Sequence, residues 1–197
     1  MGRIIAGAAG GRSLSSVPGT ATRPTTDRVK EALFSRLEAW DVLTDARVID
    51  LFAGSGGLGV EAASRGARSV VLVDQAEAAI KVCRANAKIV NQALARDAVT
   101  VHRGTAKSAL DSSTLGSSFT LAFLDPPYPM SEEELADILE RLALRLEPEA
   151  TIVVERSQRS PEPRWAAGMQ RLAEKKYGEA RVWFADFDET EDDDAAR

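Results

Sequence analysis

Residues 47–64 read RVIDLFAGSGGLGVEAAS, and this stretch carries the strongest structural signal in the chain. The apolar run 47–52 is typical of a short buried strand, the glycines after it indicate a tight turn, and 57–64 has a helical pattern. From Gly54 onward the turn has the spacing G-x-G-x-x-G, which lets the backbone approach a ligand closely at a helix N-terminus. A strand that leads into a helix in this way indicates one unit of an α/β sheet.

The rest of the chain alternates between helix and strand patterns. Further elements are expected as strands over 69–73, 99–102, 120–124 and 151–155, and as helices over 26–39, 76–90 and 131–146. The last of these helices opens with a capping box, Ser131 followed three residues later by Glu134. Two closing strands, 171–177 and 180–187, flank a Gly-Glu turn and predict a β-hairpin. The sequence therefore predicts an α/β fold, a mostly parallel doubly wound sheet with a C-terminal antiparallel hairpin.

Length and composition are those of one globular domain. The chain has 197 residues, of which 44% are hydrophobic and 28% charged, and a domain has roughly 100–200 residues. No apolar run approaches the roughly 18 residues of a membrane span, and no signal peptide is visible, so a soluble cytoplasmic protein is expected. Cys83 and His102 are the only cysteine and histidine, which excludes an internal disulfide and a Cys/His zinc site; no metal is expected.

The net charge of −5 is unevenly distributed. Residues 186–197 carry seven acids and one arginine, whereas residues 1–30 carry five basic residues against one acid, Asp27. A segregated basic segment is typical of phosphate binding, and a solvated terminus explains it equally well. The expected division of the chain is a basic N-terminal arm (1–24), a catalytic domain (25–187) and an acidic, disordered tail (188–197).

Three acids lie where strands of the predicted sheet end. Asp50 lies within the end of the first strand, and Asp74 and Asp125 terminate the second and fourth. Ligands of such sheets bind beyond the carboxyl ends of the strands, so these carboxylates are expected along one rim. Asp74 follows Gly54 by 20 residues, the position of an acid that binds ribose hydroxyls.

Taken alone, the glycine turn with Asp74 suits a nicotinamide dinucleotide as well as S-adenosylmethionine, and a turn without any ligand is the weaker alternative. Asp50 favours S-adenosylmethionine. A carboxylate suits the cationic amino group of a methionine moiety, whereas the same charge is unfavourable beside a pyrophosphate.

The tetrapeptide Asp125-Pro126-Pro127-Tyr128 follows the fourth strand. Its two prolines stiffen the loop and remove two N–H donors. It offers a carboxylate acceptor at Asp125, a carbonyl acceptor at Pro126 and an aromatic face at Tyr128, which is the set that an exocyclic amino group on a flat base needs. A proline-stiffened turn without a ligand is the alternative, and the glycine turn upstream makes it the weaker one.

Together these two motifs resemble the amino-group methyltransferases of the Rossmann-like, S-adenosylmethionine-dependent class I. The segment 21–35, ATRPTTDRVKEALFS, narrows the likeness, because it closely resembles the RsmD family of bacterial 16S ribosomal RNA (guanine-N2)-methyltransferases. The resemblance covers roughly residues 3–187, nearly the whole chain. The Asp-Pro-Pro-Tyr motif is less specific, since DNA adenine methyltransferases share it.

The resemblance implies S-adenosyl-L-methionine as the cofactor. The residues that would hold it are Asp50, Gly54, Ser55, Gly56, Asp74, Gln75, Thr105 and Ala106. The family often has an acid in the loop where Thr105 and Ala106 stand, so adenine recognition is assigned here to backbone groups. The residues that would hold the target guanine while its N2 attacks the methyl group are Asp125, Pro126, Pro127 and Tyr128.

The implied partner is small-subunit ribosomal RNA. Its phosphates would be bound by Arg3, Arg12, Arg23 and Arg28. A single domain with a weakly basic arm needs a pre-organised surface, so an assembly intermediate or the 30S subunit is the expected substrate. The alternatives are a DNA or RNA adenine-N6 methyltransferase, a dinucleotide-dependent oxidoreductase and a non-catalytic RNA-binding assembly factor. The chain offers no extra domain for reading a DNA sequence, which disfavours DNA.

Overall fold

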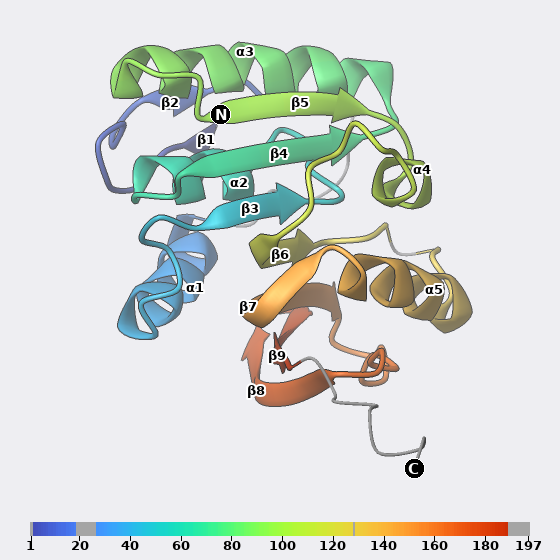
Figure 1. Cartoon of the computed structure of the whole chain (residues 1–197). Helices are drawn as coiled ribbons and strands as arrows, with labels where there is room; N and C mark the ends of the chain where they lie inside the picture. The colour runs from blue at the N-terminus through green and yellow to red at the C-terminus, as the bar shows by residue number, and fades with distance from the viewer. Residues whose placement is uncertain (1, 19–26, 128, 189–197) are drawn as a thin grey trace.

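The computed structural model describes residues 2–18, 27–127 and 129–188. Its helices are α1 (Asp27–Ala39), α2 (Gly57–Ser64), α3 (Glu77–Leu94), α4 (Ala106–Leu110) and α5 (Glu132–Ala143). Its longer strands are β3 (Arg47–Asp50), β4 (Ser69–Asp74), β5 (Val99–Arg103), β6 (Phe119–Leu124), β7 (Leu146–Ser157), β8 (Met169–Tyr177) and β9 (Ala180–Phe187). Within the described residues these strands form one sheet in the order β5-β4-β3-β6-β7-β9-β8 (Figure 1).

The predicted fold class is confirmed by the strand pairing. β3 runs parallel to β4 and β6, β4 to β5, and β6 to β7. β9 pairs antiparallel with β7 and with β8, so the C-terminal hairpin closes one edge. Several boundaries differ from the prediction: α3 continues to Leu94 where an end at 90 was expected, and β7 spans Leu146–Ser157 where 151–155 was expected. α5 ends at Ala143 because Leu146 already pairs with Phe119 in the sheet, and the short helix α4 was not predicted.

Alternate residues of the central strands pack on opposite faces of the sheet. On β6, Leu121 and Phe123 join the apolar cluster beneath α1, α2 and α3, whereas Ala122 and Leu124 join the cluster beneath α4 and α5. This period of two is the pattern of a strand that is buried on both sides. We call the first side the hairpin face, because a short N-terminal hairpin within residues 2–14 also covers it. The second side is the α5 face.

The N-terminal segment is packed into the domain. β1 (Gly2–Arg3) pairs antiparallel with β2 (Ser13–Leu14), and the side chains of Ile4 and Leu14 are buried in the core. The described residues 2–18 therefore pack against the hairpin face, and the expected division at residue 25 stays a prediction. No helix in the described part of the chain is long and apolar enough to cross a membrane.

Candidate active site

Four acids lie at the carboxyl ends of four neighbouring strands. Asp74 ends β4, Asp50 ends β3, Asp125 follows β6, and Glu155 lies in the last part of β7. The three strands β4, β3 and β6 are adjacent and parallel, so the predicted common rim of Asp74, Asp50 and Asp125 is confirmed. The rim is the part of the sheet where ligands of this architecture bind.

Asp50 is a buried carboxylate, only 2% exposed. Its Oδ2 accepts a hydrogen bond from the Gly59 N–H at 3.3 Å, and within the described residues it makes no ion pair. Desolvation, followed by the negative charge of Asp125, raises the pKa of Asp50 from 3.8 to about 7. A buried anion without a cationic partner is unfavourable, so this position is suited to a positively charged ligand group.

The glycine turn lies over Asp50 and is held from α3. The Cys83 thiol donates to the Gly54 carbonyl at 3.2 Å, and the Asn86 amide donates to the Ser55 carbonyl at 2.8 Å. Gly56 has φ +78°, and a Cβ on it would lie 2.7 Å from the Leu72 side chain, so only glycine fits there. A Cβ on Gly54 would meet no heavy atom within 4 Å, which shows that the turn is open on that side.

Asp74 ties the turn to the adjacent strand. Its Oδ2 accepts from the Gly54 N–H at 2.9 Å, and its Oδ1 accepts from the Ala76 N–H at 2.8 Å. The side chain is half-buried and Gln75 beside it is exposed. Each carboxylate oxygen has a further lone pair, so Asp74 retains acceptor capacity for ribose hydroxyls, and that role stays a prediction.

Thr105 and Ala106 form the start of α4. The Thr105 hydroxyl accepts from the Ser108 N–H at 3.0 Å and caps the helix, while Ala106 is buried. Because the Thr105 side chain is engaged in this cap, a role in adenine recognition falls to the backbone of the loop. That role also stays a prediction.

The proline loop leads away from the rim next to Asp50. Asp125 is exposed, Pro126 is buried and Pro127 is exposed, while the predicted stacking residue Tyr128 lies outside the described residues. The Pro127 carbonyl accepts from the Met130 N–H at 3.0 Å. Desolvation by the surrounding protein raises the pKa of Asp125.

Glu155 is a rim acid that the sequence reasoning did not assign to the site. Leu124 pairs in parallel register with Val154, so the next residues along the two strands, Asp125 and Glu155, lie side by side. Desolvation and the charge of Asp125 raise the pKa of Glu155. The available signal was an apolar run that ends in an acid, T-I-V-V-E, the same pattern as in the other three strands.

Arg156 braces the exit of the proline loop. Its side chain is 6% exposed, and it donates to the Met130 carbonyl at 2.9 Å and to the Glu132 carboxylate at 2.6 Å. These bonds fix the end of the loop and the start of α5 to β7. No short-range pattern indicates these contacts, which join residues 24 and 26 positions apart.

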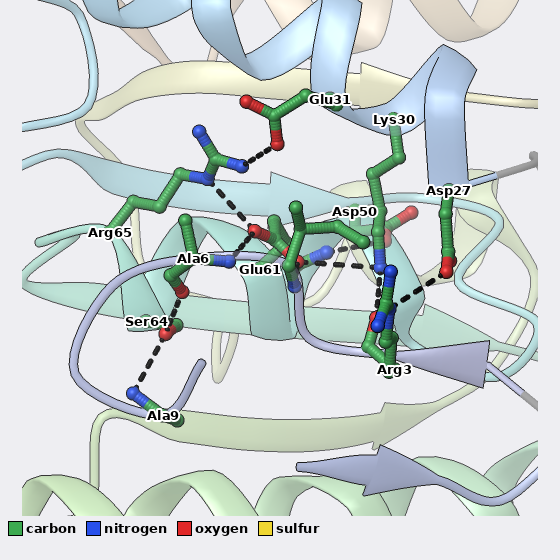
Figure 2. A network of polar contacts seen from close by, with 12 residues as sticks. Arg3, Ala6, Ala9, Asp27, Lys30, Glu31, Asp50, Glu61, Ser64 and Arg65 are labelled. Carbon is green, nitrogen blue, oxygen red and sulfur yellow. Dashed lines mark hydrogen bonds and ion pairs between the residues drawn. The ribbon is translucent and has the colours of Figure 1, made fainter. Parts of the chain in front are cut away.

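A buried ionic network fixes the helix that follows the glycine turn. Glu61 of α2 is 0% exposed and accepts from the N–H groups of Ile5 and Ala6 at 2.8 and 3.0 Å (Figure 2). It also pairs with Lys30 of α1 at 3.3 Å and with Arg65 at 2.8 Å. The network joins the N-terminal segment, α1 and α2 into one unit.

Four arginines were predicted to bind RNA, and the structure describes three of them. Arg3 pairs with Asp27 at 3.0 Å, which neutralises part of the basic segment (Figure 2). Arg12 and Arg28 are exposed, and Arg23 lies outside the described residues. Their role in RNA binding stays a prediction. In the part of the chain that the structure describes, no group of three His, Cys, Asp or Glu side chains is arranged to hold a metal ion.

The chain is similar to a protein family, to named methyltransferases and to a solved methyltransferase structure. A model of the family described as "Conserved hypothetical protein 95" matches residues 2–186. A Bacillus subtilis protein named "Putative rRNA methyltransferase YlbH" is 37% identical over 179 residues, covering 89% of this chain and 94% of its own. The "Ribosomal RNA small subunit methyltransferase D" of Escherichia coli K12 is 36% identical over 145 residues, covering 70% and 66%. A solved Escherichia coli structure, "Putative methyltransferase yhhF", matches with a TM-score of 0.79 at 32% identity, covering 94% and 97%.

Proposed function

The chain belongs to the family described as conserved hypothetical protein 95, the RsmD family, and from this premise we propose that it methylates small-subunit ribosomal RNA. The proposed reaction transfers a methyl group from S-adenosyl-L-methionine to the exocyclic N2 amino group of a guanine. One observation carries the proposal: the buried carboxylate of Asp50 lies on the same rim as the Asp125-Pro126-Pro127 loop and has no cationic partner among the described residues.

The rim residues fit S-adenosylmethionine, which carries a cationic amino group and a sulfonium sulfur. Asp50 is desolvated and faces the negative charge of Asp125, so a bound cation would relieve a repulsion that the protein alone leaves in place. The open side of Gly54 leaves room for a ligand against the turn. A dinucleotide pyrophosphate would meet the same carboxylates with repulsion, which disfavours the oxidoreductase alternative.

The proposed methyl transfer depends mainly on how the site orients the two reactants. When bound, S-adenosylmethionine supplies a methyl group on a positively charged sulfur, which a nitrogen nucleophile can displace. Asp125 would accept one N–H of the guanine amino group and so direct the nitrogen lone pair, and the buried, rigid Pro126 would present its carbonyl to the other. Well-oriented reactants of this kind gain roughly 7–11 kcal/mol over free encounter.

Transfer leaves one proton too many on the guanine nitrogen. Asp125 is the carboxylate of the proline loop and would take this proton, because its raised pKa makes it a better acceptor than an ordinary aspartate. Desolvation and the negative charge of Asp125 raise the pKa of Glu155 beside it, so the pair holds a proton more readily than two isolated carboxylates. The proton then passes to water at the exposed rim.

The test is methyl transfer to small ribosomal subunits from a strain that lacks this enzyme. Labelled S-adenosylmethionine is supplied, the RNA is digested to nucleosides, and Asp125→Asn is run beside the wild type. Asp45→Asn serves as the matched control, since it removes the same charge at a position 64% exposed and paired with Arg68. We expect label in N2-methylguanosine, a loss of ~10²–10⁴-fold in kcat for Asp125→Asn, and no change for the control.

Other outcomes separate the alternatives. Label in N6-methyladenosine would replace guanine by adenine as the target, and label on duplex DNA but not on RNA would contradict the proposed substrate class. Full complementation of a deletion strain by Asp125→Asn would point to the assembly-factor alternative. Equal rates on protein-free 16S RNA and on 30S subunits would argue against a pre-assembled particle as the preferred substrate. Ribosome modification as proposed takes place in the cytoplasm.

A further inference from the structure

An open groove of about 680 Å³ lies between α3 and β5, outside the rim described above. Its charged lining residues are Arg84, Lys88, Arg96 and Asp97, so cations outnumber anions. β5 is the edge strand of the sheet and lies beside α3 (Figure 1), so the groove lined by residues of both elements borders that edge. None of the four residues belongs to the cofactor or base site proposed above.

The outer surface of α3 carries what we call the basic stripe, defined as Lys81, Arg84 and Lys88. Their spacing of three and four residues places them on one helix face, and all three are exposed. Seven helical residues span about 10 Å along the axis. The neighbouring Arg103 pairs with Glu77 at 3.8 Å, whereas the stripe makes no ion pair within the described parts of the chain, although the protein has more acids than bases.

The opposite side of the sheet has the reverse charge. Along α5 the charged residues are Glu132, Glu133, Glu134, Asp137, Glu140 and Arg141. A polyanion that approaches the protein is therefore attracted to the α3 side and repelled from the α5 side. This polarity selects the hairpin face and its edge as the side on which a nucleic acid would lie.

The edge of β5 is partly closed to a protein strand. The Asn91 side chain accepts from the Val99 N–H at 2.9 Å and donates to the Val99 carbonyl at 2.9 Å. A peptide that added to this edge would need the same backbone groups. The groove is thus better suited to an anionic chain bound by side chains than to an added β-strand.

The inner surface of α3 connects the groove to the cofactor turn. Asn86 is fully buried, donates to the carbonyls of Ser55 and Ser15, and accepts from the Ser15 N–H at 2.9 Å. Cys83 on the same side contacts Gly54. One helix therefore holds the glycine turn on its buried side and presents three cations on its exposed side.

We propose that the α3–β5 groove binds the phosphate backbone of the RNA that carries the target base, with the basic stripe supplying the phosphate contacts. This inference rests on the proposed function for the identity of the polyanion. It adds a binding surface to the four arginines expected from the sequence. Phosphate contacts of this kind fix the register of the RNA without reading its sequence.

The test compares Arg84→Glu/Lys88→Glu with Lys175→Glu/Lys176→Glu in the full-length protein. The second variant makes the same change in charge on two exposed lysines of β8, at the other edge of the sheet. Affinity for 16S RNA is measured by filter binding between 50 and 200 mM KCl, with S-adenosylmethionine affinity as a check on the site. KM and kcat are then measured on 30S subunits that lack the modification.

For the groove variant we expect RNA affinity at least ~10-fold below that of the control variant, and a salt dependence of log K shallower by about 2, since each phosphate contact contributes about 0.9 to the slope. KM for the particle rises with it, while kcat at saturating RNA and cofactor affinity stay within about twofold of the wild type.

Equal RNA affinity for the two variants would overturn the proposal. So would a raised KM on 30S subunits with unchanged affinity for protein-free RNA, because that result assigns the groove to a ribosomal protein. If the wild type transfers no methyl group to RNA but the groove variant still loses RNA affinity, the proposed reaction fails and the groove stands.

Discussion

The two faces of the sheet are fixed by different kinds of interaction. On the hairpin face, the N-terminal segment and helices α1–α3 meet through buried polar groups, among them Lys30, Glu61, Ser64 and Asn86. On the α5 face, the buried residues of α5 are Leu135, Ile138, Leu139 and Leu142, all apolar. Buried polar contacts therefore join several elements on the hairpin face, whereas on the α5 face the ion pair of Arg156 with Glu132 holds the start of a helix that otherwise packs through apolar residues.

The difference follows from the sequences of the two segments. α5 has an apolar stripe at helical spacing and its own capping box, so it satisfies its backbone locally and packs by hydrophobic contact. The N-terminal segment forms the two-residue strands β1 and β2, and N–H groups between these strands are instead bound by Glu61 and Ser64 of α2. At Gly7, φ is +81° and a Cβ would lie 1.9 Å from the Ser64 carbonyl oxygen, so the contact is also close.

The largest effect is expected from breaking the hairpin face at Glu61. Glu61→Ala leaves Lys30, Arg65 and two backbone N–H groups without their buried acceptor, and we expect a loss of about 3–5 kcal/mol in the free energy of unfolding. Denaturant unfolding measures the loss, and limited proteolysis should cut within residues 2–15 first. Glu61→Gln, which keeps an acceptor but loses the charge, should be intermediate; a loss below ~1 kcal/mol for Glu61→Ala would contradict the role of the network.

A change of the opposite sign is expected at Asp50, which also lies beneath the hairpin face. Its folded-state pKa of about 7 is above the ordinary 3.8, so the folded protein binds this proton more tightly and stability from this group falls as pH rises from about 4 to 7. Asp50→Asn keeps an acceptor for Gly59 and should increase the free energy of unfolding at pH 8 by ~1–3 kcal/mol, with no gain at pH 4. The melting temperatures of the variant and the wild type at the two pH values measure this difference.

The same titration should control cofactor affinity in the wild type. The ionised form of Asp50 attracts the cationic ligand, so affinity for S-adenosylmethionine should rise between pH 5.5 and 7.5. At pH 6 the affinity should be about tenfold below the plateau that it reaches at higher pH. Calorimetric titration over this range measures it. Asp50→Asn should bind weakly with a flat profile, and an unchanged profile in that variant would assign the titration to another group.

A smaller effect is expected on the α5 face from the loss of a cap. The Ser131 hydroxyl accepts from the Glu134 N–H at 3.2 Å, and the Glu134 carboxylate accepts from the Ser131 N–H at 3.0 Å. Ser131→Ala should cost about 1 kcal/mol of unfolding free energy, well below the cost of Glu61→Ala. Chemical denaturation of both variants tests the contrast; equal losses would mean that the two faces are fixed with similar strength.

The smallest effect is expected at an exposed ion pair. Arg68 and Asp45 pair at 2.8 Å but are 63% and 64% exposed, so Arg68→Ala should change stability by no more than about 0.5 kcal/mol. Thermal unfolding at low and high salt is the measurement. A larger loss would show that an exposed ion pair contributes substantially to stability, which would contradict the contrast drawn with the buried network of Glu61.

The sequence by itself determined the elements that short-range residue patterns define. The strand, glycine turn and helix of residues 47–64, the capping box at Ser131 and the closing hairpin were all visible as short-range patterns. Because parallel strands end at a common edge, the same patterns also placed Asp50, Asp74 and Asp125 on one rim.

Only the tertiary structure decided which distant residues meet. Glu155 joins Asp125 through the register of β6 and β7, Asn86 and Cys83 reach the glycine turn from α3, and Glu61 binds N–H groups 55 and 56 residues away. No short-range periodicity encodes such contacts, because they depend on where the packed elements bring polar groups together. The motifs proposed to form the site could therefore be recognised in the sequence, whereas the contacts that position them could be recognised only in the fold.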